Sequence, residues 1–419
     1  MNALLGALVL FLLGVLGVRF SFTGPGTPIG WRFFFVTGTH FLIIGLLLGP
    51  YALELLTPAV LGQLYPLLAL GLGWVGLLFG LQFDRHQLTL LTPRLVALAV
   101  LQATFAFLAF LAIGMALFAS AGALHGGARA ALAAAAATAC VSSPLGIAVV
   151  SNFLRERGRL TELLLLIASL DAVVGIVALQ LAFAFYNPNV LYGAGVAAAP
   201  LTWLALALAL GISFGIIFLW LTRPKPTREE LTLFVLGIAM FLSGAALHLG
   251  LSTLFVGMVA GAVIANLSPL ERRVFNVLQG WEKSIYVVLL VLMGAMIDLA
   301  TWLIVPLAIG YTAVRLVAKL LGGWAAARLV ARDARPPALI GLGLAAQGGM
   351  SLVLVLSVTL SFGALGGAQP AVITLLVSTV VLGVILSELL GPFLTRHLLR
   401  RTEGGMRGDV IVPREANAR

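Results

Sequence analysis

Charged residues are scarce in this sequence of 419 residues. Asp, Glu, Lys and Arg make up 10% of it and hydrophobic residues 61%, whereas soluble domains have about 25% and about 45–50%. This composition excludes a water-soluble globule. The apolar segments are too long for the strands of a membrane β-barrel and lack their alternation. We therefore expect an all-α polytopic membrane protein.

Several kinds of chemical group are also missing. Cys140 is the only cysteine, so no intramolecular disulfide can form. The sequence contains no cluster with metal-ligand spacing, no nucleophile–base pattern and no glycine-rich phosphate loop. Nothing therefore supports an enzyme, and we expect no cofactor.

About thirteen apolar segments have the length and composition of transmembrane helices. The first has no basic residues before its apolar run and no clear cleavage site, so we interpret it as a retained helix rather than a signal peptide. The expected segments are 1–18, 33–50, 65–82, 95–119, 130–150, 160–186, 200–221, 231–248, 252–267, 284–298, 301–327, 337–361 and 371–395.

Basic residues orient these segments. If the N-terminus is outside, the connections on the cytoplasmic side and the C-terminal tail hold 22 of the 25 Lys and Arg residues; Arg129 falls on an outer loop, and Arg315 and Lys319 fall inside a segment. This distribution predicts an external N-terminus and a cytoplasmic C-terminus in the inner (plasma) membrane. The net charge of +10 then reflects topology and attraction to the lipid bilayer, not nucleic-acid binding.

Two pairs of similar motifs suggest inverted repeats. Leu78–Asp84 (LFGLQFD) resembles Leu292–Asp298 (LMGAMID), and the preceding helix ends alike in Gly45–Pro50 (GLLLGP) and Gly257–Pro269 (GMVAGAVIANLSP). Asp84 is expected inside and Asp298 outside, so the repeats have opposite orientations. Chance similarity between Leu- and Gly-rich helices is the alternative.

This symmetry predicts the domain organisation. One transmembrane exchanger domain spans 1–398, with repeat one at about 1–186, a linker helix at 200–221 and repeat two at about 231–395. Residues 399–419 form a short polar cytoplasmic tail.

Each repeat is expected to contain one broken helix. Ser142-Ser143-Pro144 lies in the middle of one segment, and Gln347-Gly348-Gly349 lies in its counterpart. Proline and glycine weaken helices, and hydroxyl and amide oxygens can bind a cation or satisfy the freed backbone groups. Ordinary proline kinks and glycine packing sites are the alternative.

Asp171 is the strongest candidate for function. It lies in an apolar run, Leu163–Tyr186, that is long enough to cross a bilayer. A carboxylate at that depth costs about 2.5–3.5 kcal/mol even on lenient insertion scales. We therefore expect Asp171 to bind a proton and a monovalent cation, which makes the chain an ion or proton transporter.

Three more ionisable groups lie in apolar segments. Lys319 and Arg315 are one turn apart and share a helix face. Lys319 is either a proton carrier or the partner of Asp171, with a permanent structural salt bridge as the alternative. Arg315 better suits a fixed structural pair. Glu388 corresponds roughly in position to Asp171, but a structural role is favoured, with Arg315 as a candidate partner.

These residues together carry a family resemblance. The motifs above, with Ser169-Leu170-Asp171, RLVAKLLGG around Lys319 and AAQGGMSLVL around Gln347, make residues 1–398 resemble the monovalent cation:proton antiporter superfamily. The similarity is greatest to its bacterial branch of sodium/proton exchangers and potassium-efflux transporters. It implies a 13-helix inverted-repeat fold, usually a homodimer, with a dimerisation domain and a mobile core domain.

The resemblance also implies roles for particular residues. Asp171 would be the ion- and proton-binding carboxylate and Lys319 its basic partner, with Ser142 and Ser143 part of the crossed-helix site. The sequence departs from the family pattern because one carboxylate stands where electrogenic members carry two adjacent aspartates. Gln347-Gly348-Gly349 replaces a commoner Arg/Gly/Glu pattern, and the tail is too short for the nucleotide-binding domain of potassium-efflux relatives.

The sequence therefore favours a secondary active antiporter that exchanges Na⁺ or K⁺ for protons by alternating access. A sodium-coupled symporter of an organic anion on a related fold is the first alternative, although it would not need Lys319. A non-transporting scaffold or receptor is the second, and it would not need a buried Asp171.

Overall fold

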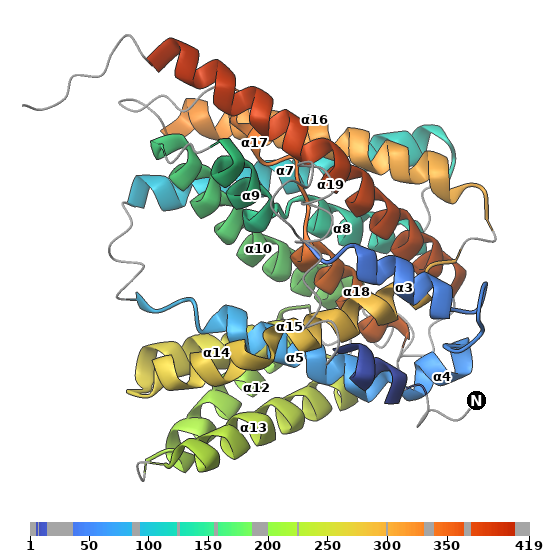
Figure 1. The fold of residues 1–419 in the computed structure, drawn as a ribbon. Helices are drawn as coiled ribbons and strands as arrows, with labels where there is room; N and C mark the ends of the chain where they lie inside the picture. Colours follow the sequence, from blue (N-terminus) through green and yellow to red (C-terminus); the bar gives the residue numbers. More distant parts are fainter. Residues whose placement is uncertain are drawn as a thin grey trace, which may run out of the picture.

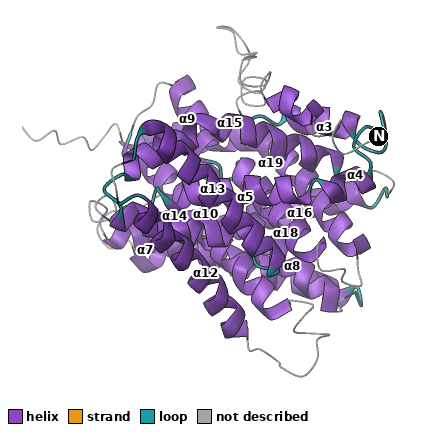
Figure 2. Cartoon of the chain, turned by 90° about the horizontal axis from the view of Figure 1, so that it is seen from below, coloured by secondary structure: helices purple, strands orange, loops and turns teal. Residues whose placement is uncertain are grey.

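The computed structural model is a bundle of helices that run roughly side by side (Figure 1). It describes residues 6, 8–14, 37–85, 93–123, 126–154, 158–186, 200–223, 226–298, 301–330, 339–363 and 370–406. These residues form helices, turns and loops and contain no strand (Figure 2). The fold class expected from composition is confirmed.

Each of the thirteen predicted segments contains helix. The first is seen at residues 8–14, and a short helix, α4 (Pro58–Gln63), lies in a connection. Two predicted segments are each split into two helices, α8 with α9 and α17 with α18. Apart from α4, the labelled helices are α3 (His40–Leu48), α5 (Tyr65–Gly80), α7 (Pro93–Ser120), α8 (Gly126–Ala139), α9 (Pro144–Leu154), α10 (Arg159–Tyr186), α12 (Pro200–Leu221), α13 (Arg228–His248), α14 (Thr253–Leu267), α15 (Glu271–Ala295), α16 (Ile304–Val330), α17 (Ile340–Gly343), α18 (Gly349–Gly363) and α19 (Pro370–Met406).

Two predicted boundaries are wrong. α15 begins at Glu271 rather than at 284, and α19 continues past Pro392 to Met406, so the expected start of the tail at 399 lies inside a helix. Hydropathy marks where a helix enters the apolar layer, whereas a helix with charged residues continues into the aqueous boundary. The rest of the predicted tail, 407–419, lies outside the described residues.

The helices form two groups, defined by which of them pack together. The first group contains α3, α5, α12, α13, α14 and α15, and the second contains α7 to α10 and α16 to α19. In Figure 1, α5, α12, α13 and α14 lie in the lower part of the molecule and α7, α9, α16 and α17 in the upper part. Each group combines helices from both halves of the sequence.

The packing follows the predicted repeat symmetry. In the first group α3 packs on α15 and α5 packs on α14, which are equivalent pairs if the second helix of repeat one matches that of repeat two. In the second group α7 packs on α10 as α16 packs on α19. The helices therefore pack as two structural repeats.

Glycines in the repeated motifs hold these pairs close. A side-chain carbon at Gly45 would overlap the carbonyl of Val291 and approach Gly294, and one at Gly80 would overlap the carbonyl of Met258 and approach Gly261. Helix backbones come this close in membranes only where small residues meet. The glycines identified as repeated motifs are therefore packing contacts between the repeats.

Candidate ion-binding site

Two broken helices meet in the middle of the second group. α8 ends at Ala139 and α9 begins at Pro144, and the segment between them, 140–143, is not helical. Pro144 needs no hydrogen-bond partner for its nitrogen at the first helical position, and the Ser143 hydroxyl accepts a hydrogen bond from the Gly146 N–H at 3.1 Å. The predicted Ser-Ser-Pro break is therefore a helix start capped by Ser143.

The second break follows the same plan. α17 ends at Gly343 and α18 begins at Gly349. The two non-helical segments cross in direct contact, because the Ser143 N–H donates to the Ala346 carbonyl at 3.0 Å. A Cβ at Gly348 would lie 2.5 Å from the Ser143 hydroxyl oxygen, so this crossing requires glycine.

Arg315 joins the two breaks. Its guanidinium donates to the carbonyls of Ala345 at 2.5 Å, Val141 at 2.9 Å and Leu344 at 3.2 Å. These carbonyls lie just beyond the C-terminal ends of α8 and α17, where carbonyl oxygens have no partner within the helix. The buried guanidinium therefore contacts both breaks, and a fixed structural role for Arg315 stays a prediction.

The predicted pairing of Arg315 with Glu388 is wrong. Glu388 instead accepts hydrogen bonds from the hydroxyls of Thr39 and, at 3.3 Å, Thr37. The two terminal nitrogens of Arg315 donate to three backbone carbonyls instead, because a planar fork of donors fits several oxygens at once.

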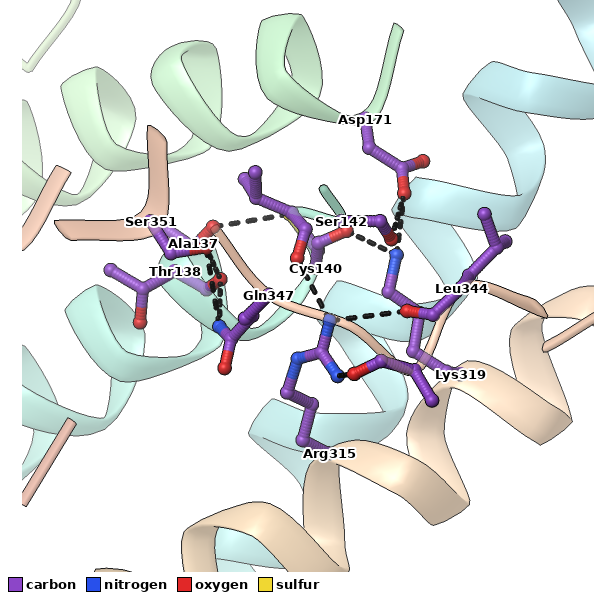
Figure 3. A network of polar contacts seen from close by, with 12 residues as sticks. Ala137, Thr138, Cys140, Ser142, Asp171, Arg315, Lys319, Leu344, Gln347 and Ser351 are labelled. Atoms are coloured by element: carbon purple, nitrogen blue, oxygen red, sulfur yellow. Dashed lines mark hydrogen bonds and ion pairs between the residues drawn. The ribbon is translucent and has the colours of Figure 1, made fainter. Parts of the chain in front are cut away.

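Asp171 faces the first break from α10 (Figure 3). Its side chain is fully buried, and its Oδ2 accepts hydrogen bonds from the Ser142 hydroxyl at 2.7 Å and from the Lys319 ammonium at 2.6 Å. Lys319, also fully buried, donates in addition to the Cys140 carbonyl. The predicted contact between Lys319 and Asp171 is present.

The second carboxylate oxygen of Asp171 is different. No described residue donates a hydrogen bond to Oδ1, although it is buried. Leaving a buried acceptor without a donor is costly. This oxygen is therefore available to a ligand such as a proton or a metal ion.

Gln347 and Ser143 do not reach Asp171. The Gln347 amide donates to the Thr138 carbonyl and the Tyr311 hydroxyl, both at 2.9 Å, and to the Ser351 hydroxyl at 3.3 Å. Figure 3 shows Gln347, Thr138 and Ser351 at the other end of the polar network from Asp171. In this conformation Gln347 links α8, α16 and α18, and a role as an ion ligand stays a prediction.

Sequence reasoning missed Tyr311 and Thr138. Tyr311, Arg315 and Lys319 are spaced four residues apart on α16, so they line one face along both breaks. That spacing was visible in the sequence. Thr138, whose hydroxyl lies 3.2 Å from that of Tyr311, offered no comparable signal within its alanine-rich helix.

A cavity lies between the two helix groups, on the side of α5, α10 and α15. Its volume is about 500 Å³, and residues after α5, in the middle of α10 and at the start of α15 line it, including Ser169 and Leu170. Asp84, Glu271 and Arg272 also line it.

The groups around Asp171 have the chemistry that hard cations and protons require. Carboxylate, hydroxyl and carbonyl oxygens are the ligands that such cations prefer. A family model described as the transmembrane sodium/hydrogen exchanger matches residues 4–400. The chain belongs to the sodium/hydrogen exchanger family. This is a transporter family, as the sequence motifs predicted.

Solved structures of one antiporter have the same fold. The structure of the sodium proton antiporter MjNhaP1 from Methanocaldococcus jannaschii at pH 8 is 17% identical, with 97% of this chain and 98% of that chain covered at a TM-score of 0.63. An electron-microscopy structure of MjNhaP1 is 16% identical, covers both chains fully and has a TM-score of 0.60. No curated protein matches the sequence.

Proposed function

We propose that this sodium/hydrogen exchanger exchanges Na⁺ or K⁺ for protons across the membrane, with Asp171 as the group that binds either one. The observation that carries the proposal is the state of its carboxylate, which is fully buried, bonded through Oδ2 only and open to a ligand at Oδ1. A carboxyl group that holds a proton is neutral, whereas cation binding needs the ionised carboxylate. A proton and a cation therefore compete for Asp171. That competition couples the two fluxes.

Lys319 acts as an internal substitute for the cation. Its ammonium occupies Oδ2 of Asp171 at 2.6 Å, and a buried carboxylate needs such a partner when no other charge is bound. A bound Na⁺ or K⁺ takes over this role, with the Ser142 oxygen as a second ligand. Lys319 then retains the Cys140 carbonyl as an acceptor.

The two helix groups supply the alternating access. Asp171, Lys319 and both broken helices belong to the second group, and Arg315 ties the two breaks together. The second group therefore moves as one unit that carries the ion, while the first group stays in place. The cavity lined by Leu170 supports assigning that face as the open side in this conformation.

The sequence patterns support a membrane orientation and an oligomeric state for the protein. The distribution of Lys and Arg supports an external N-terminus and a cytoplasmic C-terminus in the inner membrane. The family resemblance supports a homodimer formed through the first group. The single carboxylate and its ammonium partner disfavour both a sodium-coupled anion symporter and a non-transporting scaffold.

Purified protein in vesicles tests the proposal. A proton gradient is established, a salt of Na⁺, K⁺ or Li⁺ is added, and the loss of the gradient is followed with a pH-sensitive dye. We expect wild-type protein and Glu162→Gln, a control with the same change at an exposed position of α10, to dissipate the gradient. Asp171→Asn should not, because an amide cannot ionise.

Other outcomes support the alternatives. Sodium uptake that requires an organic anion and leaves the proton gradient intact would indicate the symporter. Wild-type protein that moves no cation under any gradient would indicate the scaffold. Near-normal exchange in Asp171→Asn would refute the role of this residue.

A further inference from the structure

A second buried carboxylate lies outside the site around Asp171. Glu388 on α19 is 3% exposed, and its Oε2 accepts hydrogen bonds from the Thr39 and Thr37 hydroxyls, which are 2.9 Å apart. Asp171 has an ammonium partner, whereas Glu388 has two neutral hydroxyls. Within the described residues, Glu388 forms no salt bridge.

In the described residues, no cationic side chain from the helices packed against α19 pairs with Glu388. α8, α9, α16, α17 and α18 pack on α19, and α9, α17 and α18 contain no ionisable side chain. On α16, Arg315 and Lys319 donate elsewhere. The other ionisable groups on or beside these elements include Arg129 in the first turn of α8, Cys140 directly after α8, Tyr311 and Arg328 on α16, His40 beside Thr39, Asp298 near Ser378, and Arg396, His397, Arg400, Arg401 and Glu403 on α19 itself.

Glu388 bridges the two helix groups. α19 belongs to the second group, and Thr37 and Thr39 directly precede α3 of the first group. Further hydrogen bonds join the groups, among them those from the Asp298 N–H to Ser378 at 2.9 Å and between Ser252 and Ser357 at 3.2 Å. Both use neutral groups, so the contact at Glu388 is the one among these three that a proton can change.

α19 also holds the ion site. A side-chain carbon at Gly391, one turn after Glu388, would overlap Ala346 in the second helix break. Thr395 donates to the Gly343 carbonyl at the end of α17, at 3.3 Å. A contact that holds α19 against the first group therefore also holds the crossing of the broken helices.

An ionised Glu388 needs both hydroxyls, because a buried carboxylate without a cation is stabilised only by its hydrogen-bond donors. If the helix groups move apart, an ionised side chain loses both donors at once. A protonated side chain loses much less, since it carries no charge. We propose that Glu388, with Thr37 and Thr39, is a second proton-binding site whose proton permits the two helix groups to move relative to each other.

This inference rests on the proposed function for the movement itself. Below the pH at which Glu388 ionises, the two groups are free to exchange between conformations. Above that pH, the ionised side chain holds them in the conformation described above. The proton stays on Glu388 through the cycle, so it is not one of the transported protons.

A distance measurement tests the proposal without any transport. Spin labels are attached at Leu53→Cys after α3 and Leu390→Cys on α19, both exposed, in a Cys140→Ala background, and the full chain is placed in lipid nanodiscs. Distances are recorded between about pH 6 and about pH 10, the range that includes the titration of buried carboxyl groups.

We expect one distance at alkaline pH and a second population at acidic pH. In Glu388→Gln, which is neutral at every pH, the second population should persist at alkaline pH. The same pH dependence in Glu388→Gln as in the unsubstituted background would overturn the proposal. Glu162→Gln serves as the control and should behave as that background does.

A second variant covers the case in which Glu388→Gln does not fold. The double substitution Thr37→Val with Thr39→Val removes the donors that favour the ionised form, so the second population should persist to a pH about one unit higher. An unchanged transition would contradict the proposal. In vesicles, Glu388→Gln should retain exchange and extend it to more alkaline pH. Loss of exchange in Asp171→Asn tests the proposed function separately.

Discussion

Lys319 lies one helical turn after Arg315 on α16, and the two buried cations have different partners. Arg315 donates only to backbone carbonyls of the broken helices, whereas Lys319 reaches the carboxylate of Asp171 at 2.6 Å as well as the Cys140 carbonyl. The guanidinium holds the breaks in place, and the ammonium can leave its carboxylate. Substitutions at the two positions therefore have different expected effects.

Lys319→Ala should lower the thermal stability of the protein. It leaves Asp171 buried without a cation, and breaking a buried ion pair from one side costs about 3–5 kcal/mol. Thermal unfolding in detergent measures this loss, with Arg328→Ala on an exposed part of the same helix as the control. Adding Asp171→Asn to Lys319→Ala should recover much of the stability, because no charge is then stranded. A double variant no more stable than Lys319→Ala would argue against the pair.

Arg315→Lys should destabilise the protein despite the retained charge. An ammonium cannot match the fork that reaches Ala345, Val141 and Leu344, so buried carbonyls lose a charged donor at a cost of about 1.5–3 kcal/mol. Unfolding temperatures of this variant and of Arg328→Lys give the comparison. If both substitutions have equally small effects, the guanidinium is not what joins the breaks.

Gly261→Ala should destabilise the pair formed by α5 and α14. The added carbon would overlap the Leu77 carbonyl, and forcing an extra methyl group into a close contact costs about 1–3 kcal/mol. Gly310→Ala on α16 is the matched control, because no atom lies within 4 Å of its added carbon and alanine favours helix by up to about 1 kcal/mol. A Gly261→Ala protein as stable as Gly310→Ala would refute the close helix contact.

The sequence predicted much of this architecture for physical reasons. Hydropathy located the spans because a bilayer requires about 20 apolar residues for each helix, and the cost of burying a charge identified Asp171 and Lys319. It could not assign Glu388 to Thr37 and Thr39, because their contact joins residues about 350 positions apart. It also could not separate Ser142, which meets Asp171, from Ser143, which caps α9.

Exchange should be electroneutral if Asp171 is the only carboxylate that titrates at the site. One proton then replaces one monovalent cation, so the membrane potential contributes nothing, whereas each uncompensated charge would contribute about 2.3 kcal/mol per 100 mV. Reconstituted protein on a solid-supported membrane should give no sustained current in a cation gradient. A sustained current in wild-type protein that disappears in Asp171→Asn would mean that Lys319 also releases its proton during the cycle.

The most direct test of the account is proton release when the cation binds. Purified protein in weakly buffered detergent is titrated with NaCl or KCl, with choline chloride as the control, and a pH dye counts the protons released at several starting pH values. The account predicts up to about one proton per chain in wild-type protein and in Glu162→Gln, and none in Asp171→Asn. Release is expected at starting pH values at which Asp171 carries a proton, not at those at which it is ionised and paired with Lys319. Cation binding without proton release at every starting pH in wild-type protein, or the same release in Asp171→Asn, would contradict the claim that one carboxylate binds both.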